Sequence, residues 1–509
     1  MNFRVCLLAA MLAAATTTNA TAAVRLPKTL SDHAVLQRDR PIHLWGWATA
    51  GAHLLLNFHA QTLATIANPR GAWSVYLQPE SAGGPYALTI SGDEADLVVN
   101  DLLVGDVWIA SGQSNMEFPL KGFGPSAPLK DQAKEISAAN NSKLRLLIVD
   151  KKSSDFPADD IGRVWMLCTP DTASEFSAVA YFFGREIAAD ENVPVGLVDV
   201  TWGGTPADSW VSMNTLGANA QLLPAFAQRA VFADQQTDLD ATVAAEKRED
   251  DEAKAKGQPA PWHPWHPFEG SWLPAGLYNG MIAPLTPMSV RGFLWYQGEA
   301  NSSPDRAPNY ATLLPALIGD WRMHFAQGRL PFLFVQISSF DSPNEEWGLI
   351  RDAQRRALDV KDTAMAVSLD VGEPHNVHPP DKQTIGHRLA LAARNIVYGE
   401  PTHFEGPMFR EATPYRTADG TVGMCVWFYH AAGLNFHGQT ATGFELAGAD
   451  HHFVPAEASL QGETVLVQSG AVTKPMYVRF GWSSFVENSL YNSDGLPAST
   501  FTSEPSPLR

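Results

Sequence analysis

Between residues 102 and 395 the chain repeats one pattern: a short apolar run, a polar segment, and then a stretch with helical character. Nearly continuous apolar runs are typical of strands that are buried on both faces of a parallel sheet. The apolar runs cover residues 102–110, 195–202, 292–296, 332–337 and 364–369. The helical stretches cover residues 177–189, 310–321, 347–358 and 382–395. This alternation predicts an α/β fold with a doubly wound parallel sheet.

Both flanks of this region have a different character. With 509 residues, the chain is long enough for two or three domains. Residues 23–100 contain short strand-like runs separated by glycine turns, which predict an N-terminal β-domain. The α/β domain then covers 101–400, with an insertion at about 211–275 that is first charged and then rich in proline and tryptophan. Residues 401–509 return to β character, and we expect a C-terminal β-rich region there.

The first residues resemble a targeting segment. Arg4 precedes an apolar run over 6–15, and Ala20-Thr21-Ala22 fits a signal-peptidase site. We therefore predict a signal peptide over 1–22 and an exported protein, either periplasmic or secreted. The apolar run is too short to cross a bilayer, so the mature form should have no membrane span. The alternative is a retained hydrophobic anchor.

Charge and cysteine content limit the partners and the cross-links. The formal net charge of -18 would repel a phosphate backbone, so we expect no nucleic-acid partner. Only Cys168 and Cys425 remain after cleavage of the signal peptide. In an exported protein they could form a disulfide, but two buried thiols fit the sequence equally well.

A serine follows the first apolar run in the sequence GDVWIASGQSNM over residues 105–116. Ser114 would lie at the carboxyl end of a parallel strand, which is where ligands bind in open α/β sheets. Its backbone N–H could also hold an oxyanion. A serine in a glycine-containing turn is more often structural. The interpretation of Ser114 as a nucleophile therefore depends on the segments that follow it.

Two later strands end in segments that could complete an oxyanion hole. Gly203 and Gly204 follow the second apolar run, and glycine lets a backbone N–H approach a substrate oxygen closely. Gln297 follows the third run, and its neutral amide can donate a hydrogen bond, whereas an ionised Glu299 cannot. We therefore interpret Gln297 as a candidate donor. The alternative is that Gln297 and Glu299 only brace their loops.

A histidine lies on the loop after the last apolar run, in the sequence DVGEPHNVHP over residues 370–379. From that position His378 could reach across the sheet to Ser114 and act as its general base. A metal-dependent hydrolase that uses His375, His378 and Asp370 is a second interpretation. It lacks the helical His pair of common zinc hydrolases, and proline lies on both sides of the loop. We predict no metal and no organic cofactor.

Together these segments resemble the sialate O-acetylesterase family within the SGNH hydrolases. The matching segments are GDVWIASGQSNM, GLVDVTWGGTPADSW, LYNGMIAPL, FLWYQGEAN and VHPPDKQTIGHRLA, with HAVLQRDRPIHLWGWA and LYNSDGLPASTF in the flanks. Related plant-polysaccharide acetylesterases share these blocks. The resemblance implies a three-layer SGNH hydrolase domain with accessory β-sandwich-like domains. It also implies a nucleophile at Ser114, a base at His378, and oxyanion donors from the Ser114 backbone, from a glycine of Gly203-Gly204 and from a side chain near Gln297.

The sequence departs from the family pattern next to the histidine. SGNH enzymes commonly place an aspartate three residues before it, where this chain has His375, and sialate-esterase-like sequences often place one two residues before it, where this chain has Asn376. The group that orients His378 is therefore open between Asp370, Glu373, Asn376 and none. Loss of an orienting carboxylate weakens such chemistry without abolishing it.

These observations predict a carbohydrate O-acetylesterase that acts through a Ser-His acyl-enzyme mechanism. The acetylated sugar could be sialic acid or a plant cell-wall polysaccharide such as xyloglucan or xylan. The alternative from another class is a non-catalytic carbohydrate-binding protein, which the β-domains and fifteen tryptophans would suit. Trp262 and Trp265, in the insertion, are candidate sugar-binding residues, although such rings can also anchor a loop to the core.

Overall fold

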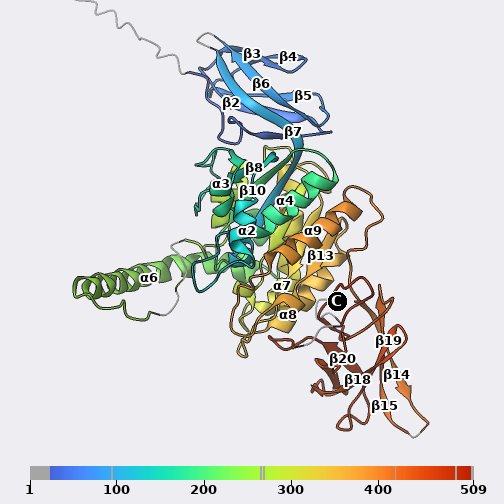
Figure 1. Ribbon diagram of the computed structural model, residues 1–509. Coiled ribbons are helices and arrows are strands. Elements are labelled where there is room, and N and C mark those ends of the chain that lie inside the picture. The colour runs from blue at the N-terminus through green and yellow to red at the C-terminus, as the bar shows by residue number, and fades with distance from the viewer. Residues whose placement is uncertain are drawn as a thin grey trace, which may run out of the picture.

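The computed structural model describes residues 23–92, 96–263, 266, 270–418, 420–438, 440–487 and 490–505. The predicted signal peptide, residues 1–22, lies outside the described residues. Figure 1 shows an N-terminal β-domain, a central α/β domain and a C-terminal β-domain arranged one after another, with a long helix that extends away from the centre. Within the described residues, no helix combines the length and the apolar character that a membrane crossing requires.

The central domain contains the predicted α/β sheet. Its strand order is β13-β12-β11-β7-β10-β8-β9, and all neighbours are parallel except the pair β8 and β9. The strands are β7 (Leu97–Gly112), β8 (Asn141–Ile148), β9 (Met166–Cys168), β10 (Val195–Thr201), β11 (Gly292–Tyr296), β12 (Phe332–Gln336) and β13 (Thr363–Val367). The predicted fold class is thus confirmed, and the five predicted strands are present. Strands β8 and β9 were not predicted.

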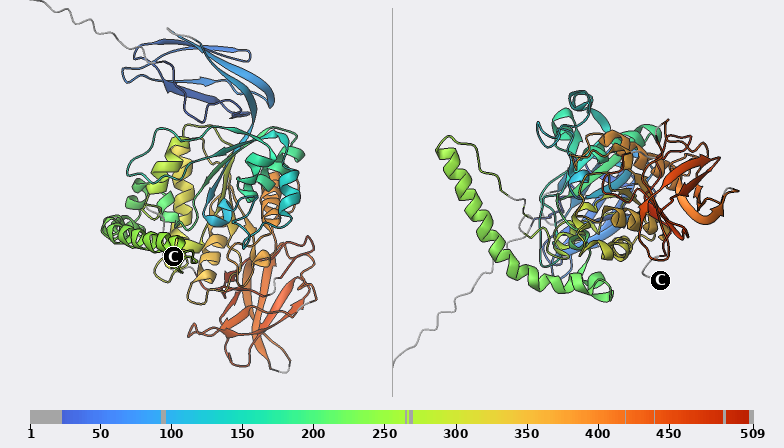
Figure 2. Two further views of the ribbon diagram at one scale, coloured as in Figure 1. Left: turned by 60° about the vertical axis from the view of Figure 1, so that its left-hand side comes forward. Right: turned by 90° about the horizontal axis from the view of Figure 1, so that it is seen from below.

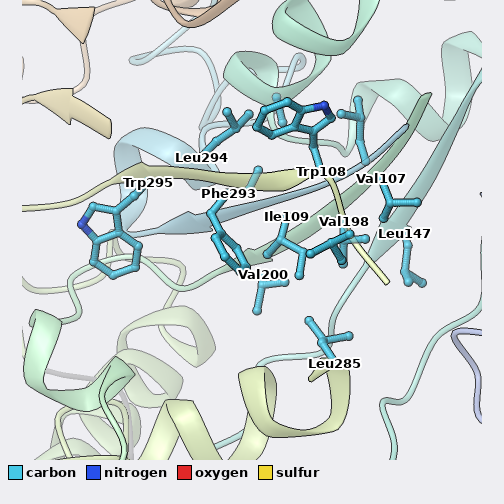
Figure 3. Close-up of a cluster of buried hydrophobic side chains, with 14 of the residues drawn as sticks. Val107, Trp108, Ile109, Leu147, Val198, Val200, Leu285, Phe293, Leu294 and Trp295 are labelled. Atoms are coloured by element: carbon cyan, nitrogen blue, oxygen red, sulfur yellow. The ribbon is translucent and has the colours of Figure 1, made fainter. Parts of the chain in front are cut away.

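Helices cover both faces of this sheet. On one face α4 (Ala178–Asp190) packs against α9 (Lys382–Ile396), and Trp108 contacts Phe183 of α4 edge-on. On the other face Phe293 packs against Trp321 of α7 (Ala307–Phe325). Figure 3 shows Trp108 and Phe293 pointing to opposite sides of the strands. The core therefore lies in two layers, one on each side of the sheet.

Strand β7 also belongs to the N-terminal β-domain. Its first half pairs with β6 (Gly83–Ser91) antiparallel and with β1 (Val35–Gln37) parallel, and its second half pairs with β10 and β11. The remaining strands of the N-terminal β-domain are β2 (Ile42–Trp47), β3 (His53–Phe58), β4 (Gln61–Ile66) and β5 (Ala72–Leu77). The strand crosses the predicted boundary at residue 100 without interruption, so a continuous ladder joins the two domains instead of a linker.

The C-terminal β-domain consists of two four-stranded sheets with a hydrophobic core of their own. One sheet contains β14 (Met408–Arg416), β15 (Val422–Tyr429), β19 (Thr464–Gln468) and β18 (Glu457–Gln461). The other contains β17 (Val454–Pro455), β16 (Phe444–Ala447), β20 (Tyr477–Phe480) and β21 (Phe501–Thr502). Cys168 in β9 and Cys425 in β15 are free thiols, so the possible disulfide between them is not formed.

The charged part of the insertion is a helix that extends into solvent. Helix α6 (Leu223–Ala255) has 33 residues, and both views in Figure 2 show it leaving the body of the protein. The smaller helices are α1 (Ser114–Glu117), α2 (Gln132–Ser137), α3 (Pro170–Ser174), α5 (Met213–Ala218) and α8 (Trp347–Arg356). The charge and helical character of residues 234–256 predict a solvated helix or a mobile excursion there, and the helix begins eleven residues earlier, at Leu223.

One buried arginine connects the central domain to the C-terminal β-domain. Arg351 of α8 has no exposed surface and donates to the carbonyl oxygens of five residues. These acceptors are Ile337, Ser338, Gly481, Ser483 and Ser484. Because three of the five acceptors belong to the C-terminal β-domain, the arginine fixes the position of that domain against α8.

We expect Arg351→Met to lower the free energy of unfolding by about 3 kcal/mol, because buried carbonyl groups lose their donor. The melting temperature and the midpoint of chemical unfolding measure this loss. Arg410→Met is the control, since Arg410 is half exposed and forms an exposed ion pair with Glu411. It should change stability by less than about 0.5 kcal/mol. Equal losses in both variants would contradict the role given to Arg351.

Candidate active site

The nucleophile candidate lies where β7 ends and α1 begins. Gly112, two residues before Ser114, has a φ of 134°, which is accessible mainly to glycine. A Cβ atom at this position would lie 2.2 Å from the carbonyl oxygen of Tyr296 on β11. The N–H of Gln113 then donates to the same carbonyl. The close approach of β7 and β11 therefore turns the chain so that Ser114 stands at the carboxyl edge of the sheet.

The structure brings Ser114 and His378 together. The Oγ atom of Ser114 lies 2.8 Å from Nε2 of His378, a hydrogen-bonding distance between residues that are 264 positions apart in the chain. His378 is on the loop between β13 and α9, and Ser114 follows the central strand β7. The two side chains thus meet at the carboxyl edge of the sheet, as expected for a nucleophile and its base.

His378 is held in its neutral form. Burial, and secondly the positive charge of Lys382, lower the pKa of His378 to about 4. The ring lies beside two phenylalanines, with ring centres 6.3 Å from Phe118 and 5.1 Å from Phe123. A neutral imidazole can accept a proton from Ser114 over a wide pH range.

None of the acids considered from sequence contacts the His378 ring. Both carboxylate oxygens of Asp370 accept hydrogen bonds from Arg388, at 2.7 Å each. Glu373 accepts from the Asn376 side chain, and the amide oxygen of Asn376 accepts from the backbone N–H of His378. Among the described residues, the side-chain hydrogen bond of His378 is therefore the one to Ser114, and Asn376 positions its backbone.

A buried polar cluster lies directly behind the pair. The amide nitrogen of Asn115 donates to Glu299 at 2.6 Å and to the carbonyl oxygen of Val377 at 3.0 Å, and its amide oxygen accepts from Lys382 at 2.5 Å. Burial raises the pKa of Glu299 and lowers that of Lys382 to about 7. Because Asn115 follows Ser114 and Val377 precedes His378, this cluster joins the two catalytic segments. Asn115 and Lys382 were not predicted from the sequence as parts of the site.

The glycines after β10 lie next to the nucleophile. A Cβ atom on Gly203 would lie 3.3 Å from the Cβ atom of Ser114, so a side chain there would crowd the site. The N–H of Gly203 donates to Glu117. Among the described residues, the N–H groups of Ser114 and Gly204 have no hydrogen-bond acceptor. These two groups are thus free to donate to an oxyanion.

Gln297 is placed differently from the predicted donor. Its side chain is fully buried, and its amide nitrogen donates to the carbonyl oxygen of Thr205 and to Asn301. Its amide oxygen accepts from the hydroxyl of Tyr310. The side chain therefore braces the loops after β10 and β11, which corresponds to the alternative interpretation. In the arrangement observed, its hydrogens are not available to an oxyanion.

The aromatic segment of the insertion reaches the site through a different tryptophan. Trp262 is 85% exposed, and Trp265 lies outside the described residues. Trp272 donates from its indole nitrogen to the carbonyl oxygen of Gly204 at 2.7 Å, and Arg306 lies over its ring. Trp272 thus holds the glycine loop beside Ser114. The sequence signal for it was its place at the end of the proline-rich stretch, which does not reveal this contact.

The residues of the metal interpretation are not assembled as a ligand set. Asp370 is bound to Arg388, His375 is exposed and His378 is bound to Ser114. Among the described residues, no group of three or more His, Cys, Asp or Glu side chains has the arrangement of a metal site.

A cavity of about 890 Å³ opens beside the pair. Its lining includes Glu117, three residues after the nucleophile, and Phe123, whose ring packs against His378. The ends of β8 and β10 form its opposite wall through Ile148 and Thr201. The cavity therefore lies at the edge of the sheet that carries Ser114, although neither Ser114 nor His378 is among its lining residues. A serine, a neutral histidine and a cavity at this edge are the features of a serine hydrolase.

Comparisons with known proteins identify the family within that class. The family described as "Carbohydrate esterase, sialic acid-specific acetylesterase" matches residues 262–395. Sialate O-acetylesterase of Rattus norvegicus is 31% identical over 75% of this chain and 76% of its own length, and that of Homo sapiens is 28% identical over 75% and 73%. The crystal structure of a carbohydrate acetylesterase from Xanthomonas citri has 36% identity and a TM-score of 0.79, covering 94% of this chain and 99% of that one.

The chain therefore belongs to the sialate O-acetylesterase family of carbohydrate esterases. It is an acetylesterase, a carboxylic-ester hydrolase, and the resemblance found in the sequence is confirmed. Membership of this family favours the prediction of an enzyme over the alternative prediction of a non-catalytic carbohydrate-binding protein.

The lowered pKa of His378 predicts the acid limit of activity. A general base works only when unprotonated, so kcat/KM should rise with pH through the pKa of His378, about 4, and stay level above it. An unperturbed histidine would instead give half of the plateau at about pH 6.5. Measurement of kcat/KM for a small aryl acetate between about pH 3.5 and 8 tests this, with enzyme stability checked at each pH. A midpoint near pH 6.5 would contradict the environment described for His378.

The positive charge of Lys382 predicts that its removal will shift the acid limit of activity. Lys382→Gln removes the charge that disfavours protonated His378, so the acid limb of kcat/KM should move to higher pH. Lys382→Arg keeps the charge and should leave the limb below that of the glutamine variant. Thermal unfolding of both variants shows whether they fold. An unchanged limb in Lys382→Gln, with only a lower kcat, would mean that Lys382 acts through packing alone.

Proposed function

We propose that the protein removes O-acetyl groups from carbohydrates through a covalent acetyl-enzyme on Ser114. The observation that carries this proposal is the 2.8 Å contact between the Ser114 hydroxyl and His378 Nε2, at the carboxyl edge of the sheet and beside a cavity. The hydroxyl has a base within reach, and the base is neutral at physiological pH. Both are requirements for nucleophilic attack by serine on an ester.

The first half-reaction forms the acetyl-enzyme. Oγ of Ser114 attacks the carbonyl carbon of the acetyl group while His378 Nε2 takes the hydroxyl proton. The carbonyl oxygen becomes an oxyanion, which the N–H groups of Ser114 and Gly204 stabilise. When the intermediate collapses, the bond to the sugar oxygen breaks, and His378 returns the proton to that oxygen. The deacetylated sugar leaves.

The second half-reaction restores the enzyme. A water molecule takes the place of the sugar, and His378 removes one of its protons as the water oxygen attacks the acetyl carbon. The same two N–H groups stabilise the second oxyanion. Collapse releases acetic acid, which ionises to acetate in solution, and the proton on His378 returns to Oγ of Ser114. No further cofactor is needed for the atoms and charges to balance.

In the part of the chain that the structure describes, no carboxylate contacts the His378 ring. Asn376 fixes its backbone, and Asn115 fixes the neighbouring carbonyl of Val377. We therefore propose a Ser-His dyad that is oriented by amide side chains. An aspartate in the usual triad holds the imidazole and stabilises its protonated form. Its absence here is consistent with the low pKa of His378.

The proposed substrates are acetylated glycans. The curated relatives are named for sialate, and the Xanthomonas citri relative is named for carbohydrate in general. Both O-acetyl sialic acid and acetylated plant polysaccharides, such as xyloglucan or xylan, are within the proposed function. We also propose that residues 1–22 are a signal peptide and that the enzyme acts in the periplasm or outside the cell, where such polymers are accessible.

Removal of either member of the dyad should abolish turnover. Ser114→Ala and His378→Ala should each lower kcat by about 10⁴-fold or more, and the double variant should be little worse, because the two groups act as a unit. Acetate release from an aryl acetate and from acetylated oligosaccharides measures this. His375→Ala is the matched control, since His375 is exposed on the same loop. Near-normal activity of a pure, folded Ser114→Ala preparation would rule out the serine mechanism.

A further inference from the structure

The cavity beside the dyad has a mixed charge that bears on which sugar it accepts. Three cationic side chains line it, Lys121, Lys151 and Arg163, and each has an acidic partner in the same lining. Lys151 lies 2.5 Å from Glu117, Arg163 lies 2.5 Å from Asp150, and Lys121 lies 2.6 Å from Glu175. The positive charges of the cavity are therefore already neutralised by the protein.

A fourth acidic residue adds negative charge to the lining of the cavity. Asp199, at the end of β10, also lines the cavity, where it accepts hydrogen bonds from the Thr201 hydroxyl and the Ser177 N–H. Burial raises the pKa of Asp199 to about 7, so part of its negative charge remains at neutral pH. The lining thus has no cation without an acidic partner, and it has one acid more than it has cations.

Recognition of a sugar carboxylate requires the opposite arrangement. Carboxylates are bound by arginine or lysine groups that can donate to them, usually in charge-assisted pairs. Here the cations that could attract an incoming carboxylate are already balanced by Glu117, Asp150 and Glu175. The carboxylate would also meet the repulsion of these acids and of Asp199. The net charge of -18 on the chain repels anions at longer range as well.

The same lining suits an uncharged sugar. The side chains of its ion pairs offer donors and acceptors to hydroxyl groups without a net charge to compensate. Phe123 is 40% exposed and stands between the cavity and His378, so its ring offers a flat apolar surface to the face of a sugar. The volume of about 890 Å³ lies in the range of small-molecule sites.

We propose that this cavity is the sugar-binding site and that it selects neutral acetylated glycans against sugars that carry a carboxylate, sialic acid included. The inference rests on the proposed function, because it assumes that the acetyl group is transferred at Ser114. It extends that function by naming the charge class of the substrate. The ion pairs act as the selecting element, because the charge of each cation is already balanced by an acidic partner.

The test compares three substrates on the wild-type enzyme: an aryl acetate, acetylated xylo-oligosaccharides and a 9-O-acetylated sialic acid, with released acetate as the readout. We expect kcat/KM for the neutral oligosaccharide to exceed that for the sialic acid by about tenfold or more at low salt. The ratio should decrease as ionic strength rises, because added ions screen the repulsion.

Variants that release one cation test the cause. Asp150→Asn frees Arg163, and Glu175→Gln frees Lys121. Each should raise kcat/KM for the acetylated sialic acid by about threefold or more relative to the neutral substrate. The matched control is Asp362→Asn, which frees Arg329 from a similarly exposed pair, at 3.0 Å, next to the amino end of β13 and thus at the opposite edge of the sheet. The ratio should not change in the control.

The outcomes separate the two proposals. A wild-type preference for the sialic acid, with the aryl acetate still hydrolysed, would overturn the selection of neutral sugars and leave the acetylesterase mechanism intact. An equal change of the ratio in Asp150→Asn, Glu175→Gln and Asp362→Asn would also overturn it. Hydrolysis of the aryl acetate but of neither sugar would instead contradict the proposed carbohydrate substrate, and the inference about its charge would fall with it.

Discussion

Strand β7 pairs with four other strands along its sixteen residues, and this shared register determines where every functional segment lies. Its first half belongs to the N-terminal β-domain, and its second half is the centre of the parallel sheet. A slip of one residue would turn Trp108 away from α4 and expose the opposite set of side chains. It would also move Gly112 away from Tyr296. The approach of these two backbones places Ser114 within reach of His378, so the dyad depends on the register of a strand that begins in another domain.

The fold could be predicted where a strand is buried on both faces. Strands β10, β11, β12 and β13 are almost entirely apolar and were predicted to within a few residues. Strand β8 was missed because its first residues, such as Lys143, are polar and lie near the edge of the sheet, where only β9 covers them. The start of α6 was missed for a different reason. Charge patterns show that a segment is solvated, but they do not show where tertiary contacts end.

The site was predictable to the extent that it depends on backbone position. Ser114 and His378 follow strands whose carboxyl ends share one edge of the sheet. Their chemistry and their positions after these strands were therefore sufficient to predict that the two residues meet. Gln297 also follows such a strand, yet its side chain turns into the core, and the direction of a side chain is set by neighbours that are distant in sequence. Lys382 begins an amphipathic helix, and no sequence pattern distinguishes it from an ordinary surface lysine. Its contact with Asn115 exists only because α9 packs behind the nucleophile.

The extended helix α6 leaves and rejoins the body at nearly one place. Pro224, at its beginning, lines a small cavity together with Arg306, and Arg306 also covers the ring of Trp272, where the chain returns. Between these points the chain can be lengthened, shortened or exchanged without disturbing the sheet, because closure of a longer loop costs little entropy. The segment between these points can thus vary in length and sequence while the α/β domain stays the same. A family with this architecture can diversify its outer surface by insertion while Trp272 keeps the glycine loop beside the nucleophile unchanged.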